Sequence, residues 1–416
     1  MDGYLSASDS WTRLKQYEDE TMDEVLNRCE THPFSGGGCK GAVIRKILSI
    51  RNLLTRSNSG KRILIFPGGL DQFTEALAHN NMVIKAGLGL GIHDCFRARN
   101  IKLLDISRIA ELLNIAIVNQ DDYILVYLQR KICLFLNKYK IDLMIVVDIG
   151  NDYYRLFSYC CKRCKIPVCY IEHGLIETFI TDPKGMKKHQ ASREYIDYRW
   201  TWSQKNREVL IRNGIMNSSD IYVIGYPYNV NANNIHLNKE ECLFVGGSRL
   251  LETPSEFGYN KYYDLINLIY ELCNSLGFVL VYRPHKKEPK RFLEKLNAKI
   301  VIDRLPANAS LKKRYIVMGI RTSMLVEAGI YGCITGQLIG FENLSSSNLF
   351  DNTFKIFTDR ESIRGFLAGI RAGEIFPKPV YENQLRYQQS LDTRIEEGLR
   401  WIESMGKPNQ TTMFRA

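Results

Sequence analysis

Two apolar runs of the chain are each followed within three residues by a histidine, and these two segments are the first candidates for catalytic or ligand-binding residues. Phe278–Tyr282 leads into Arg283-Pro284-His285, and Val168–Ile171 leads into Glu172-His173-Gly174. Runs of this length and composition predict buried parallel strands. Ligands of open α/β sheets bind beyond the carboxyl ends of such strands. The two ends therefore indicate an enzyme cleft between two sheets.

The Arg283-Pro284-His285 end has the chemistry to bind a phosphate. Arginine offers a bidentate fork and histidine a short donor, and the proline between them restricts the backbone on both sides. Lys286 and Lys287 add positive charge. The alternative is a surface turn whose charges are only solvated.

The Glu172-His173-Gly174 end has the chemistry of a general base. Either Glu172 or His173 is able to take a proton from an acceptor hydroxyl while the other orients it. Gly174 permits a sharp turn and the close approach of a substrate on the acceptor side. The alternative is a buried histidine that hydrogen-bonds a neighbour.

A third candidate follows a strand expected to end at Gly319. A helix is expected to start at Thr322 or Ser323, whose hydroxyls and nearby amides would bind an anion. Glu327 lies four residues after Ser323, on the same helix face, and is expected to accept hydrogen bonds from ribose hydroxyls. The alternative is an ordinary N-cap with Glu327 in solvent.

Glycine-rich turns supply weaker signals. Gly246-Gly247-Ser248 follows a strand and would expose amides to the donor phosphate. Pro67-Gly68-Gly69 is a candidate acceptor-side loop. Gly87-Leu88-Gly89-Leu90-Gly91 lacks the GxGxxG spacing of a dinucleotide loop.

Alternating strands and helices position these residues. The alternation begins at Lys61 and restarts at Cys242, and 416 residues exceed one ordinary core. We expect an α/β protein with two doubly wound Rossmann-like domains facing a central cleft. The expected parts are an N-terminal extension (1–60), an acceptor-side domain (61–235), a nucleotide-donor-binding domain (236–380) and a C-terminal helix (381–416), with a return of that helix to the first domain as one option.

The apolar pattern predicts the individual elements. Strands are expected at 63–66, 82–84, 143–147, 168–171, 199–203, 221–224, 242–245, 278–282, 300–302, 315–318 and 333–338. Helices are expected at 44–54, 106–113, 125–139, 153–164, 204–213, 262–276, 286–296, 363–372 and 385–405. Two further helices are expected, one that follows Gly69 and ends at Leu77 and one that begins near Thr322.

Charge and composition narrow the partners. Lysine and arginine number 56 against 45 acids, a net charge of +11 spread along the chain, and no nucleic-acid recognition motif accompanies it. Anionic small substrates and an anionic membrane surface explain this charge better. Without 18 uninterrupted apolar residues or a signal pattern, a cytoplasmic protein is favoured, with the inner membrane face as a peripheral site.

The eleven cysteines lie mostly in apolar runs, which is typical of reduced, buried thiols. Cys161 and Cys164 have the CxxC spacing, but no second pair accompanies them. Asp121-Asp122 stands at an expected helix start, where capping is the simpler explanation than metal binding.

Glu-His-Gly at 172–174, Arg-Pro-His at 283–285 and Thr-Ser-x3-Glu-Ala at 322–328 follow one another in the order seen in a known group of enzymes. The combination resembles GT-B-fold transferases of bacterial surface polysaccharides, namely sialyltransferases, polysialyltransferases and teichoic-acid glycerophosphotransferases. The likeness covers about residues 140–340. Two departures are Lys286, where proline follows the histidine, and His173, where sialyltransferases have a second acid.

The resemblance implies an inverting glycosyltransferase that needs no metal and no cofactor. It implies a base at Glu172 or His173, and donor phosphate contacts from His285 and Thr322 or Ser323, supported by Arg283. The implied partners are a nucleotide-sugar donor, with a CMP-sugar such as CMP-sialic acid favoured, and a lipid-linked or growing glycan acceptor of capsule, O-antigen or lipooligosaccharide.

Other functions remain open on the same residues. A CDP-glycerol or polyol phosphotransferase would use the same cleft, and a UDP-sugar 2-epimerase shares the fold. A non-catalytic sugar-nucleotide-binding protein belongs to a different class. A dinucleotide oxidoreductase is disfavoured because no GxGxxG fingerprint is present.

Overall fold

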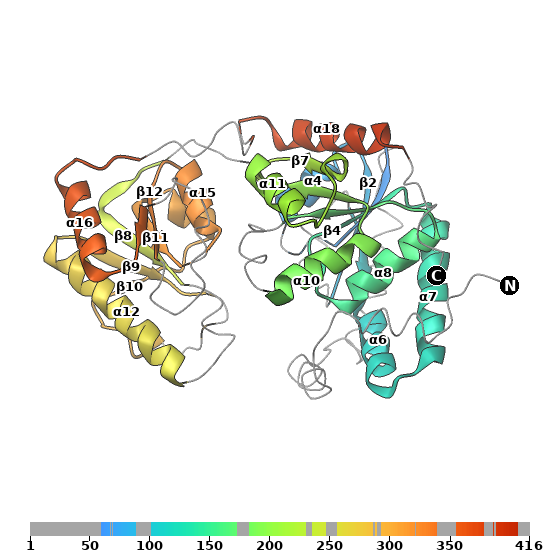
Figure 1. Cartoon of the computed structure of the whole chain (residues 1–416), viewed down its shortest axis with the longest axis horizontal. Helices are drawn as coiled ribbons and strands as arrows, with labels where there is room; N and C mark the ends of the chain where they lie inside the picture. Colours follow the sequence, from blue (N-terminus) through green and yellow to red (C-terminus); the bar gives the residue numbers. More distant parts are fainter. Residues whose placement is uncertain are drawn as a thin grey trace. The chain divides into compact units, whose positions relative to one another are not determined.

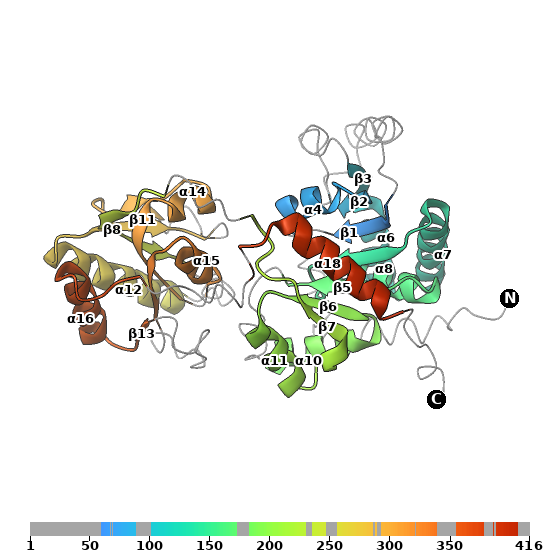
Figure 2. The same cartoon turned by 90° about the horizontal axis from the view of Figure 1, so that it is seen from above.

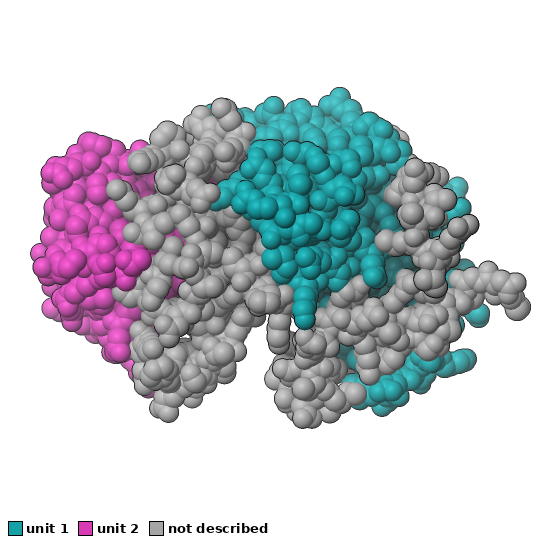
Figure 3. All heavy atoms as spheres, in the orientation of Figure 1, with its two compact units in different colours: residues 1–176, 182–229, 384–416 teal, residues 177–181, 230–383 magenta. Residues whose placement is uncertain are grey.

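The computed structural model describes residues 60–66, 68, 70–88, 101–172, 183–229, 235–246, 256–285, 288, 293–320, 322–338, 355–377, 386 and 388–406. These residues fall into two compact units. Unit 1 holds the described residues up to 172, those from 183 to 229 and those from 386 onward, and unit 2 holds those from 235 to 377 (Figure 3).

In the described part of unit 1 a seven-stranded parallel sheet has the order β3-β2-β1-β4-β5-β6-β7. Its strands are β1 (Arg62–Phe66), β2 (Met82–Gly87), β3 (Ile101–Asp105), β4 (Leu143–Val146), β5 (Val168–Ile171), β6 (Tyr198–Thr201) and β7 (Ile221–Val223). Its helices are α4 (Asp71–Leu77), α6 (Ser107–Asn119), α7 (Asp122–Tyr139), α8 (Asp152–Arg163), α10 (Pro183–Ala191), α11 (Gln204–Arg212) and α18 (Leu391–Ser404), with short 3-10 turns η1 (Ser192–Glu194) and η2 (Ser218–Asp220).

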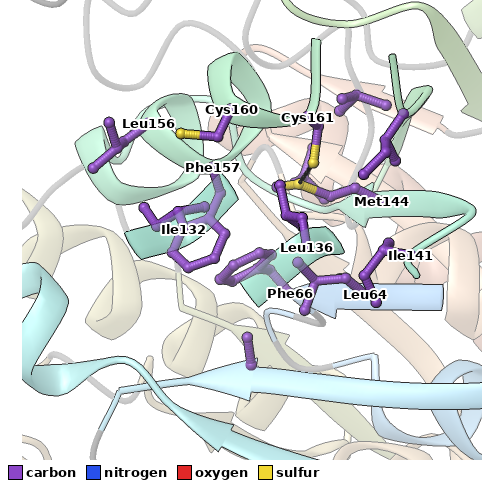
Figure 4. Packing of buried hydrophobic residues seen from close by; sticks show 14 of the residues in the cluster. Leu64, Phe66, Ile132, Leu136, Ile141, Met144, Leu156, Phe157, Cys160 and Cys161 are labelled. Atoms are coloured by element: carbon purple, nitrogen blue, oxygen red, sulfur yellow. Dashed lines mark hydrogen bonds between the residues drawn. The ribbon is translucent and has the colours of Figure 1, made fainter. Parts of the chain in front are cut away.

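Successive residues of β1 face opposite sides of this sheet, as the two-residue period of a strand requires. Ile63 and Ile65 enter one core cluster, and Leu64 and Phe66 enter the other. Side chains of α7 and α8 cover Leu64 and Phe66 (Figure 4). Helices therefore cover both faces, which makes unit 1 a doubly wound fold.

The C-terminal helix α18 packs on unit 1, against α4 and over the sheet (Figure 2). Gly398 lets it approach closely, since a Cβ there would lie 3.0 Å from the Trp200 ring. The buried Arg394 donates to the carbonyls of Ile224, Tyr226 and Tyr228. Helix α18 thereby fixes the chain where it leaves β7.

In the described part of unit 2 a six-stranded parallel sheet has the order β10-β9-β8-β11-β12-β13. Its strands are β8 (Asn238–Val245), β9 (Val279–Arg283), β10 (Val301–Ile302), β11 (Arg314–Gly319), β12 (Ile334–Leu338) and β13 (Lys355–Phe357). Its helices are α12 (Glu256–Ser275), α14 (Ala307–Leu311), α15 (Met324–Ile330) and α16 (Arg360–Arg371) (Figures 1 and 2).

Numbered within its own unit, each sheet begins 3-2-1-4-5-6, the order of a dinucleotide-binding fold. The α/β class and the two doubly wound Rossmann-like units are therefore confirmed. The expected strands and most expected helices are present, and Asp121 caps α7 by accepting from the Ile124 amide at 3.0 Å. The expected helix at 44–54 and most of the one expected at 286–296 lie outside the described residues.

Four of the described strands and α-helices were not expected: the edge strands β3 and β13 and the helices α10 and α14. Each edge strand pairs with one neighbour, so sheet pairing rather than a long apolar run supports it. The sequence of α10, Pro-Lys-Gly-Met-Lys-Lys-His-Gln-Ala, has little apolar periodicity. No helix in the described part of the chain is long and apolar enough to cross a membrane.

Candidate functional site

The carboxyl ends of β9, β8 and β11 lie side by side in unit 2. Val245, near the end of β8, pairs with Arg283 of β9 on one side and Gly319 of β11 on the other. The strand order reverses between β8 and β11, and ligands of doubly wound sheets bind at this switch point. The structure thus brings the Arg283 end and the Gly319 end, which are distant in the sequence, to the same sheet edge.

Arg283 is anchored at this edge by a buried acid. Its Nη1 donates to Asp303 Oδ2 at 2.6 Å and to the Leu305 carbonyl at 2.7 Å. Asp303 follows β10, and its side chain is 1% exposed, against 20% for Arg283. Asp303 and the Leu305 carbonyl therefore fix one nitrogen of the fork, and a phosphate contact of Arg283 stays a prediction.

A reciprocal pair of hydrogen bonds closes the turn after β9. The His285 amide donates to Glu288 Oε1 at 3.0 Å, and the Glu288 amide donates to the His285 carbonyl at 2.8 Å. Glu288 Oε2 accepts from the Tyr282 hydroxyl at 2.6 Å, which in turn lies 3.1 Å from that of Tyr262. Burial raises the pKa of Glu288, although these hydrogen bonds oppose the shift. The carboxyl group thus fixes the backbone that carries His285.

Gly246 has a structural role that the sequence did not indicate. Its amide donates to the Arg283 carbonyl at 2.8 Å and is therefore not available to a phosphate, contrary to our expectation. A Cβ at this position would lie 2.4 Å from Glu288 Oε1 and 2.9 Å from the Tyr282 hydroxyl. Glycine is required here because the end of β8 passes directly against the Glu288 carboxyl group.

The segment after β11 forms a turn and a short helix. The Thr322 hydroxyl accepts from the Met324 amide at 3.3 Å, while Ser323, the N-cap, makes no side-chain cap bond. The Glu327 amide donates to the Ser323 carbonyl at 3.3 Å, so these two residues lie one turn apart on one face, as expected. Helix α15 has only seven residues, so its N-terminus alone does not define an anion site. The contacts of Thr322, Ser323 and Glu327 with a donor stay a prediction.

In unit 1, Glu172 lies at the carboxyl end of β5 and is 1% exposed. Its Oε2 accepts from the Trp202 amide at 3.0 Å and from Asn206 Nδ2 at 2.7 Å, and its carbonyl accepts from Trp202 Nε1 at 2.7 Å. These bonds join the end of β5 to the end of β6 and the start of α11. Glu172 thus holds the connection between β6 and α11 against the end of β5.

Arg199 of β6 is a second buried polar residue in this region. Its guanidinium lies 4.9 Å from the Tyr170 ring centre and donates to Ser192 and, at 3.1 Å, to His189 Nδ1. Because a guanidinium only donates, His189 Nδ1 accepts and the neutral ring carries its proton on Nε2. Burial lowers the pKa of Arg199, while Tyr170 and Glu172 act in the opposite direction.

Gly68 lies where the strand order of unit 1 reverses, between the ends of β1 and β4. Its φ is +47°, and a Cβ would lie 2.1 Å from Val147 Cγ2. Glycine is therefore required by the close packing of the two strand ends. An acceptor contact at Gly68 stays a prediction.

Several expected site residues lie outside the described residues. They are Gly69, His173, Gly174, Gly247 and Ser248. Two residues that sequence analysis missed, Glu288 and Asp303, support the Arg283–His285 end. The available signals were an acid three residues after His285, and an acid directly after the strand expected at 300–302.

The described cysteines are free thiols, as expected. The two cysteines of the CxxC pair have different partners. Cys161 Sγ lies 3.3 Å from Met144 Sδ in the core, whereas Cys164 hydrogen-bonds Cys133 of α7. Cys160 also hydrogen-bonds Cys133. No group of His, Cys, Asp and Glu suited to holding a metal ion occurs in the part of the chain that the structure describes.

Comparison with known proteins identifies the fold. No protein-family model matches the chain, and no curated protein matches it in sequence. A putative UDP-N-acetylglucosamine 2-epimerase from Listeria monocytogenes is similar with a TM-score of 0.56 and 15% identity, over 84% of this chain and 97% of that one. MnaA from S. aureus with UDP gives 0.55 and 15%, over 84% and 99%.

A UDP-GlcNAc 2-epimerase from Methanocaldococcus jannaschii, in complex with UDP-GlcNAc and UDP, gives a TM-score of 0.53 and 14% identity, over 83% of this chain and 99% of that one. These neighbours have two Rossmann-type units of the GT-B kind, and the chain shares that fold. At such identities the likeness shows the fold alone and does not single out the sialyltransferases.

Proposed function

We propose that the chain is an inverting glycosyltransferase that moves a sugar from a nucleotide-sugar donor to a glycan acceptor. The observation that carries this proposal is the junction of β9, β8 and β11, where Arg283, His285 and the segment 322–327 follow neighbouring strand ends at a switch point. Proteins of the same fold were solved with UDP and UDP-GlcNAc, which supports a nucleotide-sugar ligand.

Unit 2 binds the donor in this proposal. Arg283, fixed on one side by Asp303, presents its other nitrogens to the phosphate, and His285 donates to the same group. The Thr322 and Ser323 hydroxyls add donors, and Glu327 accepts from the ribose. Positive charge at the leaving phosphate stabilises the transition state, in which that phosphate gains negative charge.

Unit 1 supplies the base. The acceptor oxygen attacks the anomeric carbon, the bond from that carbon to the phosphate oxygen breaks, and the hydroxyl proton passes to His173. Glu172 is assigned the positioning role because it is buried and accepts two hydrogen bonds on Oε2. The burial of Glu172 thus supports His173 as the base, a choice that the sequence left open.

The donor and acceptor classes belong to the same proposal. The sequence motifs favour a CMP-sugar such as CMP-sialic acid as the donor. The structural neighbours solved with UDP make UDP-sugars further candidate donors. The acceptor is a lipid-linked or growing surface glycan, met at the inner membrane face. Transfer of a phosphopolyol from CDP-glycerol would use the same residues and is distinguished by its product.

A UDP-sugar 2-epimerase is the second candidate, favoured by the structural neighbours of that description. An epimerase converts its sugar nucleotide without an acceptor. A transferase releases nucleotide in proportion to the acceptor added.

The experiment incubates the protein with CMP-sialic acid, CDP-glycerol and UDP-sugars, with and without a lipid extract that carries glycan acceptors, and measures the free nucleotide. Acceptor-dependent release from a sugar nucleotide supports the proposal, and acceptor-independent conversion supports the epimerase. His285→Ala should abolish release. His236→Ala, an exposed histidine before β8 in the same unit, should not.

A further inference from the structure

The outward face of α7 carries a stripe of large side chains in solvent. Tyr123 is 83% exposed, Tyr127 46% and Leu134 58%. Their spacings of four and seven residues place them on one face of the helix. Ile115 of the adjacent helix α6 is also exposed, at 38%. Isolated exposed apolar residues are ordinary, but an aligned set indicates a contact surface.

This stripe cannot turn into the core, because the opposite face of α7 is already packed there. Leu125, Leu128, Ile132 and Leu136 are buried in the cluster shared with the sheet and α8. Figure 4 shows Ile132 and Leu136 in this cluster. Both views of the chain place α7 on the outside of unit 1 (Figures 1 and 2).

The same face is basic. Arg130, Lys131 and Lys138 are exposed, and Lys140 is the C-cap. Lys131 Nζ lies 5.4 Å from the centre of the Tyr127 ring, so cation and ring share one patch. No acidic residue occurs between Tyr123 and Lys140. The exposed lysine and arginine side chains on this stretch of α7 therefore have no acidic neighbour within the stretch.

We propose that this face of α7 docks on the surface of an anionic lipid bilayer. Tyrosine rings favour the headgroup region, where the ring is partly buried and the hydroxyl stays wet. Lysine and arginine beside such rings are attracted to anionic headgroups. A second copy of the chain fits less well, because a two-fold contact would bring the same cations of both copies together. The proposal does not depend on the donor site.

The test is flotation of the full chain with phosphatidylcholine vesicles, with and without phosphatidylglycerol, at low and high salt. Binding is expected only to the anionic vesicles and only at low salt. The triple variant Arg130→Gln, Lys131→Gln and Lys138→Gln should weaken it by about 100-fold. Tyr123→Ser, Tyr127→Ser and Leu134→Ser together should weaken it by at least about 10-fold.

Matched control variants distinguish an effect of this face on vesicle binding from an effect of the net charge. The triple variant Lys295→Gln, Lys299→Gln and Arg364→Gln removes the same charge from exposed positions of unit 2, and Phe376→Ser removes an exposed aromatic there. Both controls should bind as the wild type does. Equal loss in the control triple, no binding to anionic vesicles, or a dimer that dissociates on substitution of Tyr123 and Tyr127 would each overturn the proposal.

Discussion

Glu288 and His285 exchange two backbone-directed hydrogen bonds across the turn after β9: Oε1 of Glu288 accepts from the His285 amide, and the His285 carbonyl accepts from the Glu288 amide. The same carboxyl group accepts from the Tyr282 hydroxyl inside the unit. The position of His285 is therefore set from the core through an acid that does not need to touch a ligand.

The effect of Glu288→Gln on the Tm should depend on pH. Burial raises the pKa of Glu288 in the folded protein, so the acid favours folding most when it is protonated and loses that advantage as pH rises. The Tm of the wild type minus that of Glu288→Gln should thus be highest below the unfolded pKa and fall as pH rises through the folded value. A difference that grows with pH would contradict this assignment. Thermal melts from pH 4 to pH 8 (about the range where carboxylates titrate) measure it.

Arg283→Ala should both destabilise unit 2 and weaken donor binding. It leaves the buried Asp303 without its cation, which is expected to lower the free energy of unfolding by about 3 kcal/mol. Arg283→Gln combined with Asp303→Asn removes both charges and should restore most of that stability. Nucleotide affinity should stay low in the double variant. Full recovery of affinity with stability would show that Arg283 has only a structural role.

Glu172 and His173 should separate into a positioning residue and a base. Glu172→Gln keeps an oxygen for the Trp202 amide and Asn206, so turnover should change only a few fold, whereas Glu172→Ala should lower the free energy of unfolding by about 1–3 kcal/mol. His173→Ala should lower nucleotide release by about 100-fold or more. His79→Ala, an exposed histidine of unit 1, is the control. The opposite pattern, with an inactive Glu172→Gln and an active His173→Ala, would make Glu172 the base.

Cys133 should be the first thiol of its cluster to react. Hydrogen bonds from the Cys160 and Cys164 thiols lower its pKa, while those of Cys160 and Cys164 are raised. More thiolate forms at Cys133 at a given pH, and thiolate is the nucleophile. Iodoacetamide labelling across a pH series, read by peptide mass spectrometry, should show Cys133 modified at lower pH than Cys164. Earlier labelling of Cys164, which is also half-buried, would contradict this order.

The fold could be predicted because continuous apolar runs such as 143–147 and 168–171 are typical of buried parallel strands and alternate with helical patterns along the chain. The edge strand β3, with buried and partly buried residues mixed, lacks that signal. The residues that support the site from behind were harder to predict from the sequence. Glu288 stands in His-Lys-Lys-Glu-Pro-Lys, where an acid resembles a solvated surface charge, and only the fold reveals its contact with Gly246. The burial of Glu172 likewise depends on β6 and α11, which lie 26 or more residues further along the chain.

The central claim is that the β9–β8–β11 junction of unit 2 binds the nucleotide of the donor. Thermal shifts of the wild type, His285→Ala and His236→Ala with CMP, CDP, UDP and GDP test it most directly, because a ligand stabilises the folded protein according to its affinity. We predict that at least one of these nucleotides raises the Tm of the wild type and of His236→Ala. The rise should be largely lost in His285→Ala, measured from the Tm of that variant without nucleotide. No rise with any nucleotide, or an equal rise in His285→Ala, would contradict the account.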